Sequence, residues 1–308
     1  MPEWAGGRLS RRLIVVVGSV NQDIVLRVGS LPAPGETVLA HARSVFPGGK
    51  GANQAVAAAR AGAAVAFLGR VGDDDAGAAA VANLQAAGVD TRAVRRIAST
   101  PTGAAYVAVT DDGENSIVVA PGANALCRPE DVDAATHLVQ AAALVVTQLE
   151  IPLDSVTRLS RLVHDAGVSL LLNAAPARTL PSNLLRAVKI LVVNQGEATA
   201  LVPDPADDDL MRTQRLLKLG PASAVLTLGA RGAAWRTRNR AGVVPAPTVD
   251  VVDTTGAGDA FVGALAAAVV DGRTLPDAVT FAVEVASRHT TVVGAQCPEA
   301  LINPTLAG

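Results

Sequence analysis

The stretch VVDTTGAGDAF, residues 251–261, holds two aspartates, Asp253 and Asp259, on either side of a glycine-rich turn. The segment that Asp253 closes is expected to be β-like. The run that follows, up to Val270, is almost entirely apolar, which predicts a helix buried on all sides. Three small residues occupy the start of that helix: Gly256, Ala257 and Gly258. Backbone N–H groups there lack helical partners and, together with the helix dipole, favour an anion such as a phosphate group. A carboxylate beside such a site repels the anion unless it takes a proton from the attacking group. Asp259 is therefore a candidate general base, with a helix cap as the alternative.

A second glycine-rich stretch, FPGGKGANQAVAAARAG (residues 46–62), also precedes a predicted helix. It is not a Walker A loop, because glycine rather than serine or threonine follows Lys50. The backbone at Gly49 can approach a ligand closely, and the side chains of Lys50 and Asn53 supply hydrogen-bond donors. The stretch predicts a site for a polar ligand, with a plain glycine turn and a surface lysine as the alternative.

Polar side chains also follow three predicted strands. Asn21 and Asp23 point to the same side of an extended segment and suit the binding of neighbouring hydroxyl groups, or an Asx turn. Glu150 follows a second strand. After a third, Asn194 and Glu197 stand three residues apart, where they form part of a hydrated Mg²⁺ site, a capping box, or both. Because ligands bind at the carboxyl ends of parallel strands, we expect these side chains to share one site.

Short apolar runs alternate with alanine-rich segments of helical length. This predicts a doubly wound α/β fold with a mostly parallel central sheet flanked by helices. The predicted buried strands are Leu13–Val17, Val65–Leu68, Leu144–Thr147, Ser169–Leu172, Ile190–Val193 and Ala224–Leu228. The predicted helices between them include Ala52–Arg60, Ala76–Ala87, Ser155–Asp165 and Leu210–Leu219. We expect one domain over residues 12–308, preceded by a disordered tail over residues 1–11.

Two segments, residues 22–47 and 101–119, do not follow the alternation. They carry β-rich patterns around the turns LPAPGE and TDDGEN, which predicts a small antiparallel sheet outside the central one. Such a sheet suits a lid over the site or an oligomer contact, since its edges need to be covered.

The composition excludes several classes of function. A net charge of −2 and an aromatic content of 2% provide neither the positive surface nor the stacking platform of a nucleic-acid-binding protein. No apolar run reaches the roughly 18 residues that span a bilayer, so we expect no membrane partner. Two cysteines, Cys127 and Cys297, predict no disulfide framework and a reducing cytoplasmic location. The four histidines form no zinc-ligating cluster.

The motifs, taken in order, resemble those of the PfkB sugar kinases. PGGKGANQA and DTTGAGDAF resemble the two signatures of that family. Further motifs, from about residue 13 to about residue 300, resemble most the members that phosphorylate ribose: GSVNQD, PAPGETV, GENSIVVAPGAN, TQLEIP, NAAPA, NQGE, LTLGARG and VGAQ. The resemblance implies transfer of a phosphoryl group from ATP to O5 of D-ribose, giving ribose 5-phosphate and ADP. It also implies Mg²⁺, a monovalent cation such as K⁺, and a homodimer formed through the lid.

The resemblance also implies roles for individual residues. Those implied to bind the sugar are Asn21, Asp23, Gly49, Lys50, Asn53, Glu150 and Asp259. Asp259 is implied to be the catalytic base, beside an anion hole of Gly256, Ala257 and Gly258. Those implied to line the ATP site are Asn194, Thr227, Gly229, Gly232 and Gly258, with Glu197 linked to Mg²⁺. Those implied to hold the monovalent cation are Asp253, Thr255, His289, Val292 and Gly294.

Two positions depart from the family pattern. Pro298 stands where a serine is usual near the cation, and Val283 stands where an asparagine or histidine often lies near adenine. Three other functions compete with ribose phosphorylation. The first is a family kinase acting on deoxyribose, a ketose or a nucleoside, and the second is a sugar-binding regulator without catalysis. The intact Asp259 and anion-hole glycines argue against the regulator. The third, a nicotinamide-dependent dehydrogenase, is disfavoured because no G-x-G-x-x-G follows the first strand.

Overall fold

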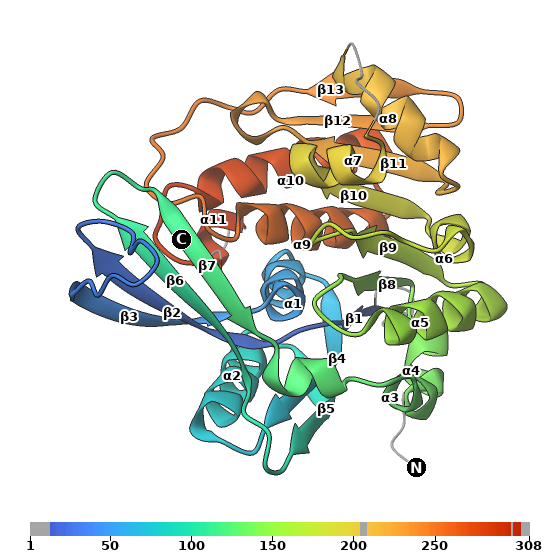
Figure 1. Ribbon diagram of the computed structural model, residues 1–308. Coiled ribbons are helices and arrows are strands. Elements are labelled where there is room, and N and C mark those ends of the chain that lie inside the picture. The colour runs from blue at the N-terminus through green and yellow to red at the C-terminus, as the bar shows by residue number, and fades with distance from the viewer. Residues whose placement is uncertain (1–12, 204–207, 297, 303–308) are drawn as a thin grey trace.

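A nine-stranded sheet forms the centre of the computed structural model, which describes residues 13–203, 208–296 and 298–302 (Figure 1). The predicted tail over residues 1–11 and Cys297 lie outside the described residues. The six predicted strands are present as β1 (Leu13–Val17), β4 (Ala64–Gly72), β8 (Leu144–Thr147), β9 (Ser169–Asn173), β10 (Ile190–Asn194) and β11 (Ser223–Thr227). Three further strands, which the apolar runs did not reveal, extend the sheet: β5 (Asp90–Ile97), β12 (Ala233–Thr237) and β13 (Ala241–Val244). The strand order is β13-β12-β11-β10-β9-β8-β1-β4-β5, with antiparallel pairing at β12 and β13 and parallel pairing elsewhere.

Alternate residues of the strands face two separate cores. In β1, Ile14 and Val16 belong to the first core, while Val15 and Val17 belong to the second. The helices over the first core are α1 (Lys50–Arg60), α2 (Asp75–Ala86), α9 (Ala257–Val270) and α10 (Leu275–His289). Those over the second are α3 (Pro129–Ala134), α4 (Thr136–Ala141), α5 (Leu153–Ala166), α6 (Ser182–Ala187), α7 (Gln195–Leu201) and α8 (Asp209–Lys218). Helices on both faces explain why the strands are continuously apolar, and the predicted doubly wound fold is confirmed.

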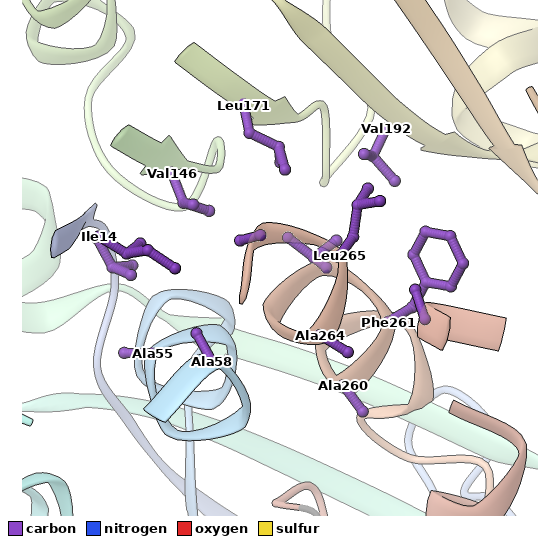
Figure 2. Close-up of a cluster of buried hydrophobic side chains, with 14 of the residues drawn as sticks. Ile14, Ala55, Ala58, Val146, Leu171, Val192, Ala260, Phe261, Ala264 and Leu265 are labelled. Atoms are coloured by element: carbon purple, nitrogen blue, oxygen red, sulfur yellow. The ribbon is translucent and has the colours of Figure 1, made fainter. Parts of the chain in front are cut away.

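Helices α1 and α9 lie side by side against the first core. Figure 2 shows them below the strand residues Ile14, Val146, Leu171 and Val192. A glycine is required at their contact, because a Cβ on Gly263 would lie 2.5 Å from the Cβ of Ala57. This close approach brings the first turn of α9 against the polar residues of α1. Although α9 is apolar almost all round, neither it nor any other helix within the described ranges is long and apolar enough to cross a membrane.

The two segments predicted to lie outside the central sheet form a separate four-stranded sheet, visible at the left of Figure 1. Its strands, in spatial order, are β3 (Ala40–Gly48), β2 (Asn21–Val28), β6 (Gly103–Thr110) and β7 (Asn115–Ala120). The outer pairings are antiparallel, whereas β2 and β6 pair in parallel. One face of β2 carries Asn21 and Asp23, and the other carries Ile24, in register with Val45 and Tyr106.

The segment leading to Asp253 was expected to be β-like, and this expectation was wrong. Residues 245–256 contain neither helix nor strand. Pro245 and Pro247 lack the N–H group that strand pairing requires. The backbone N–H groups of Val252 and Asp253 donate instead to the carbonyl of Thr290, at 2.8 and 3.1 Å. The loop before α9 is thus tied to the end of α10.

Candidate active site

Asp259 lies in the first turn of α9, with 7% of its surface exposed. Its carboxylate hydrogen bonds run to α1: Oδ2 accepts from Asn53 Nδ2 at 3.1 Å, and Oδ1 accepts from Gln54 Nε2 at 2.8 Å. The N-cap residue of α9 is Gly256, which offers no side-chain cap. The aspartate is therefore held by the neighbouring helix at the edge of a cleft that it lines together with Lys50, Asn194, Glu197, Thr227, Gly256 and Gly258.

Backbone groups at the start of α9 face this cleft. Gly256 has a φ of 77°, in the left-handed region, and a Cβ there would lie 2.2 Å from the carbonyl oxygen of Ala295. At Gly258 a Cβ would meet no atom within 4 Å, so its outer side is open. The N–H of Ala257 is engaged, since it donates to the Thr254 carbonyl at 3.2 Å. The positive end of the helix thus meets the cleft at Gly258, where an anion finds room.

Three carboxylates and a lysine gather where β2 meets this cleft. Burial, followed by the charges of Glu150 and Asp259, raises the pKa of Asp23 to about 6, against the opposing effect of Lys50. The charge of Asp259 is the largest cause of a raised pKa at Lys50, ahead of burial, which lowers it, and of Glu150. Negative charge therefore keeps Lys50 protonated, and the ammonium group makes the crowding of the carboxylates tolerable.

Lys50 and Asp259 line the cleft, and the other sugar-binding candidates lie around these two residues. Glu150 Oε2 accepts from Ser19 Oγ at 2.5 Å and from the backbone N–H of Lys50 at 3.0 Å. Asn21 is buried, and its Oδ1 accepts from Asn124 Nδ2 at 2.8 Å. The Oδ1 atom of Asp23 is buried and, among the described residues, has no hydrogen-bond partner. A hydroxyl group of a ligand would supply the missing donor.

Two glycines allow the loop before α1 to pack closely against Asp23 and the backbone of Asn21. A Cβ on Gly48 would lie 2.1 Å from the Asp23 carboxyl group. Gly49 has a φ of 88°, and a Cβ there would lie 2.7 Å from the backbone nitrogen of Asn21. The first two glycines of the PGGKG stretch are thus required by packing against β2.

The start of α7 forms a complete capping box. Asn194 Oδ1 accepts from the N–H of Glu197, and Glu197 Oε2 accepts from the N–H of Asn194, both at 2.8 Å. Burial raises the pKa of Glu197, although the hydrogen bond from Asn194 and the charge of Lys50 oppose it. Both predicted interpretations remain compatible, because the box uses one oxygen of Glu197 and the residue still lines the cleft. Gly229 and Gly232 bound the turn after Thr227, and only Thr227 of these three lines the cleft.

The residues implied to hold a monovalent cation come together beside α9. The Asp253 carboxylate accepts the N–H groups of Thr255 and Gly294, each at 2.9 Å. Burial alone would raise the pKa of Asp253, but hydrogen bonds from Gly294 and Thr255, together with the effect of His289, lower it. The Thr255 carbonyl lies 2.7 Å from Nε2 of the buried His289, whose own carbonyl accepts the N–H of Val292 at 3.3 Å. Carboxylate and carbonyl oxygens are the donors that a hard cation takes, so this group fits one.

The structure also shows where the two residues that depart from the family pattern lie. Val283 is buried in the first core, on α10. Pro298 is exposed, just before the short helix α11 (Glu299–Ile302).

A pfkB family carbohydrate kinase model matches residues 11–301. The chain belongs to the pfkB family. It is 38% identical over 285 residues to ribokinase of Bacillus subtilis, covering 92% of this chain and 95% of that protein. It is 37% identical over 287 residues to deoxyribokinase of Salmonella typhimurium, covering 92% and 94%. A solved structure of Arabidopsis thaliana ribokinase complexed with ribose and ATP matches with a TM-score of 0.87 and 33% identity, covering 96% and 98%. The predicted family and fold are thereby confirmed.

The part of the protein that the structure describes offers few side chains that could bind Mg²⁺. Over the described ranges no cluster of three or more histidine, cysteine, aspartate or glutamate side chains is arranged to hold a metal ion. Glu197 at the cleft fits Mg²⁺, because this ion keeps several waters and binds through one or two carboxylates and the substrate phosphates.

Sequence reasoning missed several polar residues that contact the predicted site residues. Gln148 and Asn173, both buried, join Gln54 behind Asp259, and Ser19 and Asn124 hold Glu150 and Asn21. Ser19, Gln148 and Asn173 lie at or just beyond the ends of β1, β8 and β9, whereas Asn124 lies in a short 3-10 helix, Gly122–Leu126. For the first three, a position at the end of an apolar strand is the signal that would have found them.

Proposed function

We propose that this kinase transfers the γ-phosphoryl group of ATP to O5 of D-ribose, giving ribose 5-phosphate and ADP. The observation that carries the proposal is Asp259, a carboxylate held by α1 at the open start of α9. The names of the relatives support ribose as acceptor. The side chains of Asn21, Asp23 and Glu150 support a small polyhydroxy acceptor, because together they offer many hydrogen-bonding groups.

In the proposed reaction, Asp259 accepts the proton of the sugar hydroxyl as its oxygen attacks the γ-phosphorus. A new P–O bond forms to the sugar, and the bond between the γ-phosphorus and the bridging oxygen of ADP breaks. Lys50 and the backbone at Gly256–Gly258 stabilise the charge on the transferred group. An alcohol gives up its proton late to a carboxylate, so positioning and charge stabilisation supply most of the acceleration.

Two cations belong to the proposal. Mg²⁺, held near Glu197 through water and phosphate oxygens, would neutralise charge on the phosphates. A monovalent cation, K⁺ in the first instance, would be held by Asp253, the Thr255 carbonyl and carbonyls near His289, Val292 and Gly294. The chain's own part is to fix the loop before α9, which the hydrogen bonds of Asp253 already tie to the end of α10.

The four-stranded sheet is proposed to act as a lid and to form a homodimer. Asn21 and Asp23 lie on its inner face, whereas the opposite face carries Ile24, Val45 and Tyr106 in register. Val45 and Tyr106 are 41% and 47% exposed, which is unusual for large apolar side chains gathered on one face. A second copy of the chain would cover them. Residues 12–308 are proposed to be one domain, acting in the cytoplasm, because a sequence of this length with two cysteines does not depend on a disulfide framework.

The test is ADP release measured with ribose, deoxyribose, fructose and adenosine as acceptors, with the Asp259→Asn variant in parallel. We expect ribose to have the highest kcat/KM and the variant to lose the activity. A higher kcat/KM with deoxyribose or adenosine would reassign the acceptor while keeping the kinase. Ribose binding without ADP release from any acceptor would make the protein a regulator.

A further inference from the structure

We propose that Gln54 is a positioning residue for phosphoryl transfer, and that Gln148 in turn fixes the side-chain amide of Gln54. The inference rests on the proposed role of Asp259 and adds two residues that act through it. Neither Gln54 nor Gln148 lines the cleft, and both are fully buried.

The Gln54 amide nitrogen lies between two oxygen atoms. Nε2 donates to Asp259 Oδ1 at 2.8 Å and to Asn173 Oδ1 at 3.0 Å. The direction of the Asn173 amide is set by the backbone, since its Nδ2 donates to the Val192 carbonyl at 3.2 Å. Reversing Gln54 would therefore place its own oxygen against the oxygens of Asp259 and Asn173. The amide has one favourable orientation, and that orientation donates to the aspartate.

Gln148 reinforces the same orientation from the other side. Its Nε2 donates to Gln54 Oε1 at 2.6 Å. Its own Oε1 is buried without a partner among the described residues, an arrangement that is costly in a protein interior. A Cβ on Gly18 would lie 2.1 Å from that oxygen, so a glycine is needed there for Gln148 to fit. The side-chain carbonyl oxygen of Gln148 thus stays unpaired while its amide nitrogen holds Gln54.

The geometry gives Asp259 two anchors with different surroundings. Asn53, which donates to Oδ2, also accepts from Gln296 Nε2 at 3.2 Å. Among the described residues, Gln54, which donates to Oδ1, also hydrogen bonds to the buried amides of Asn173 and Gln148. Three charged groups act on Asp259: Lys50 attracts its carboxylate, whereas Asp23 and Glu197 repel it, so a carboxylate that had lost an anchor would shift. A misplacement of about 1 Å at a reacting group costs on the order of 10²-fold in rate.

The test compares Gln54→Leu with Gln148→Leu, the double variant and a control, Thr147→Val. The control removes another buried hydrogen bond, from Thr147 Oγ1 to the Val17 carbonyl at 2.8 Å, and a longer one to the Gln148 backbone carbonyl at 3.5 Å, but touches none of the side-chain amides of the network. We expect Gln54→Leu to lower kcat by roughly 10–100-fold, with the ribose KM and the nucleotide Kd within about twofold of wild type. Gln148→Leu should lower kcat less, and the double variant should be no slower than Gln54→Leu alone, because Gln148 acts through Gln54.

The outcomes separate this inference from the proposed function. If Asp259→Asn abolishes turnover while Gln54→Leu lowers kcat no more than Thr147→Val, the positioning role is wrong and the kinase stands. Additive losses in the double variant would also overturn the relay from Gln148. If Gln54→Leu does not fold, Gln148→Leu decides the matter: kcat equal to the control contradicts the inference. If Asp259→Asn is itself silent, the proposed mechanism fails first.

Discussion

Two helix starts face the same cleft and are built in opposite ways. At α7, Asn194 and Glu197 satisfy each other's backbone N–H groups, so the helix closes its own end. At α9, the N-cap is a glycine and the first-turn carboxylate turns away to α1. The same residue type, an acid three residues after the N-cap, thus serves stability in one place and is free for chemistry in the other. What differs is the neighbouring helix: only α9 has a partner that takes over its carboxylate.

The largest effect is expected at the open start. Asp259→Asn keeps the shape of the side chain but cannot accept a proton, so kcat should fall by roughly 10²–10⁴-fold. The melting temperature should fall by no more than about 2–4 °C, the effect of about one hydrogen bond. The matched control is Asp208→Asn at the N-cap of α8, where the aspartate accepts from the N–H of Met211 at 2.6 Å. There both kcat and melting temperature should stay near wild type, because asparagine caps about as well as aspartate.

Ribose binding at Asp23, on the lid side of the cleft, should depend on pH. The raised pKa of Asp23, about 6, means that its carboxylate is charged above that pH and neutral below it. At pH 5 about nine-tenths of it is protonated and it no longer attracts a sugar hydroxyl strongly, so the ribose KM should rise up to about tenfold from pH 7 to pH 5. Asp23→Asn should have a raised ribose KM that no longer changes over this range. An equally steep change in the variant would assign the titration to another group.

Loop order before α9 should depend on the cation. We expect K⁺ to raise kcat several-fold over a bulky organic cation at equal ionic strength, because an ion at Asp253 and Thr255 orders the start of α9. As a control, the melting temperature of Asn194→Ala should change between the two salts by as much as that of wild type, because the Asn194 side chain bonds to Glu197 within α7. Equal rates in both salts would show that the cation has no part in catalysis.

The smallest effect is expected at the closed start. Asn194→Ala removes the side-chain cap of α7 and should lower the free energy of unfolding by about 1 kcal/mol, measured by urea titration. Any change in kcat should be far smaller than that of Asp259→Asn. A 100-fold loss of kcat at an unchanged nucleotide Kd would mean that the two helix starts share the chemistry.

The sequence allowed the central sheet to be predicted where strands are buried on both faces, as in β1, β8 and β10. It missed the two edge strands β5 and β13 and the neighbouring β12. The arginines of β5, and Arg236 and Thr237 at the end of β12, interrupt a continuous apolar run. The polar residues at the strand ends could be predicted as one site from topology. The network behind Asp259 could not, since Gln148 and Asn173 lie far from Gln54 in sequence and only the close packing of α1 against α9 and the sheet brings them together. The β-like expectation before Asp253 failed because two prolines and a bond to Thr290 decide that loop.

The most direct test is a crystal structure of the protein with ribose and a non-hydrolysable ATP analogue. The account predicts the terminal phosphate group at the backbone of Gly256–Gly258 and the sugar O5 within hydrogen-bond reach of the Asp259 carboxylate, about 2.6–3.2 Å. It also predicts that Asn194 and Glu197 keep their reciprocal bonds. A terminal phosphate bound at the start of α7, or an Asp259 carboxylate that touches no atom of the sugar, would contradict the account.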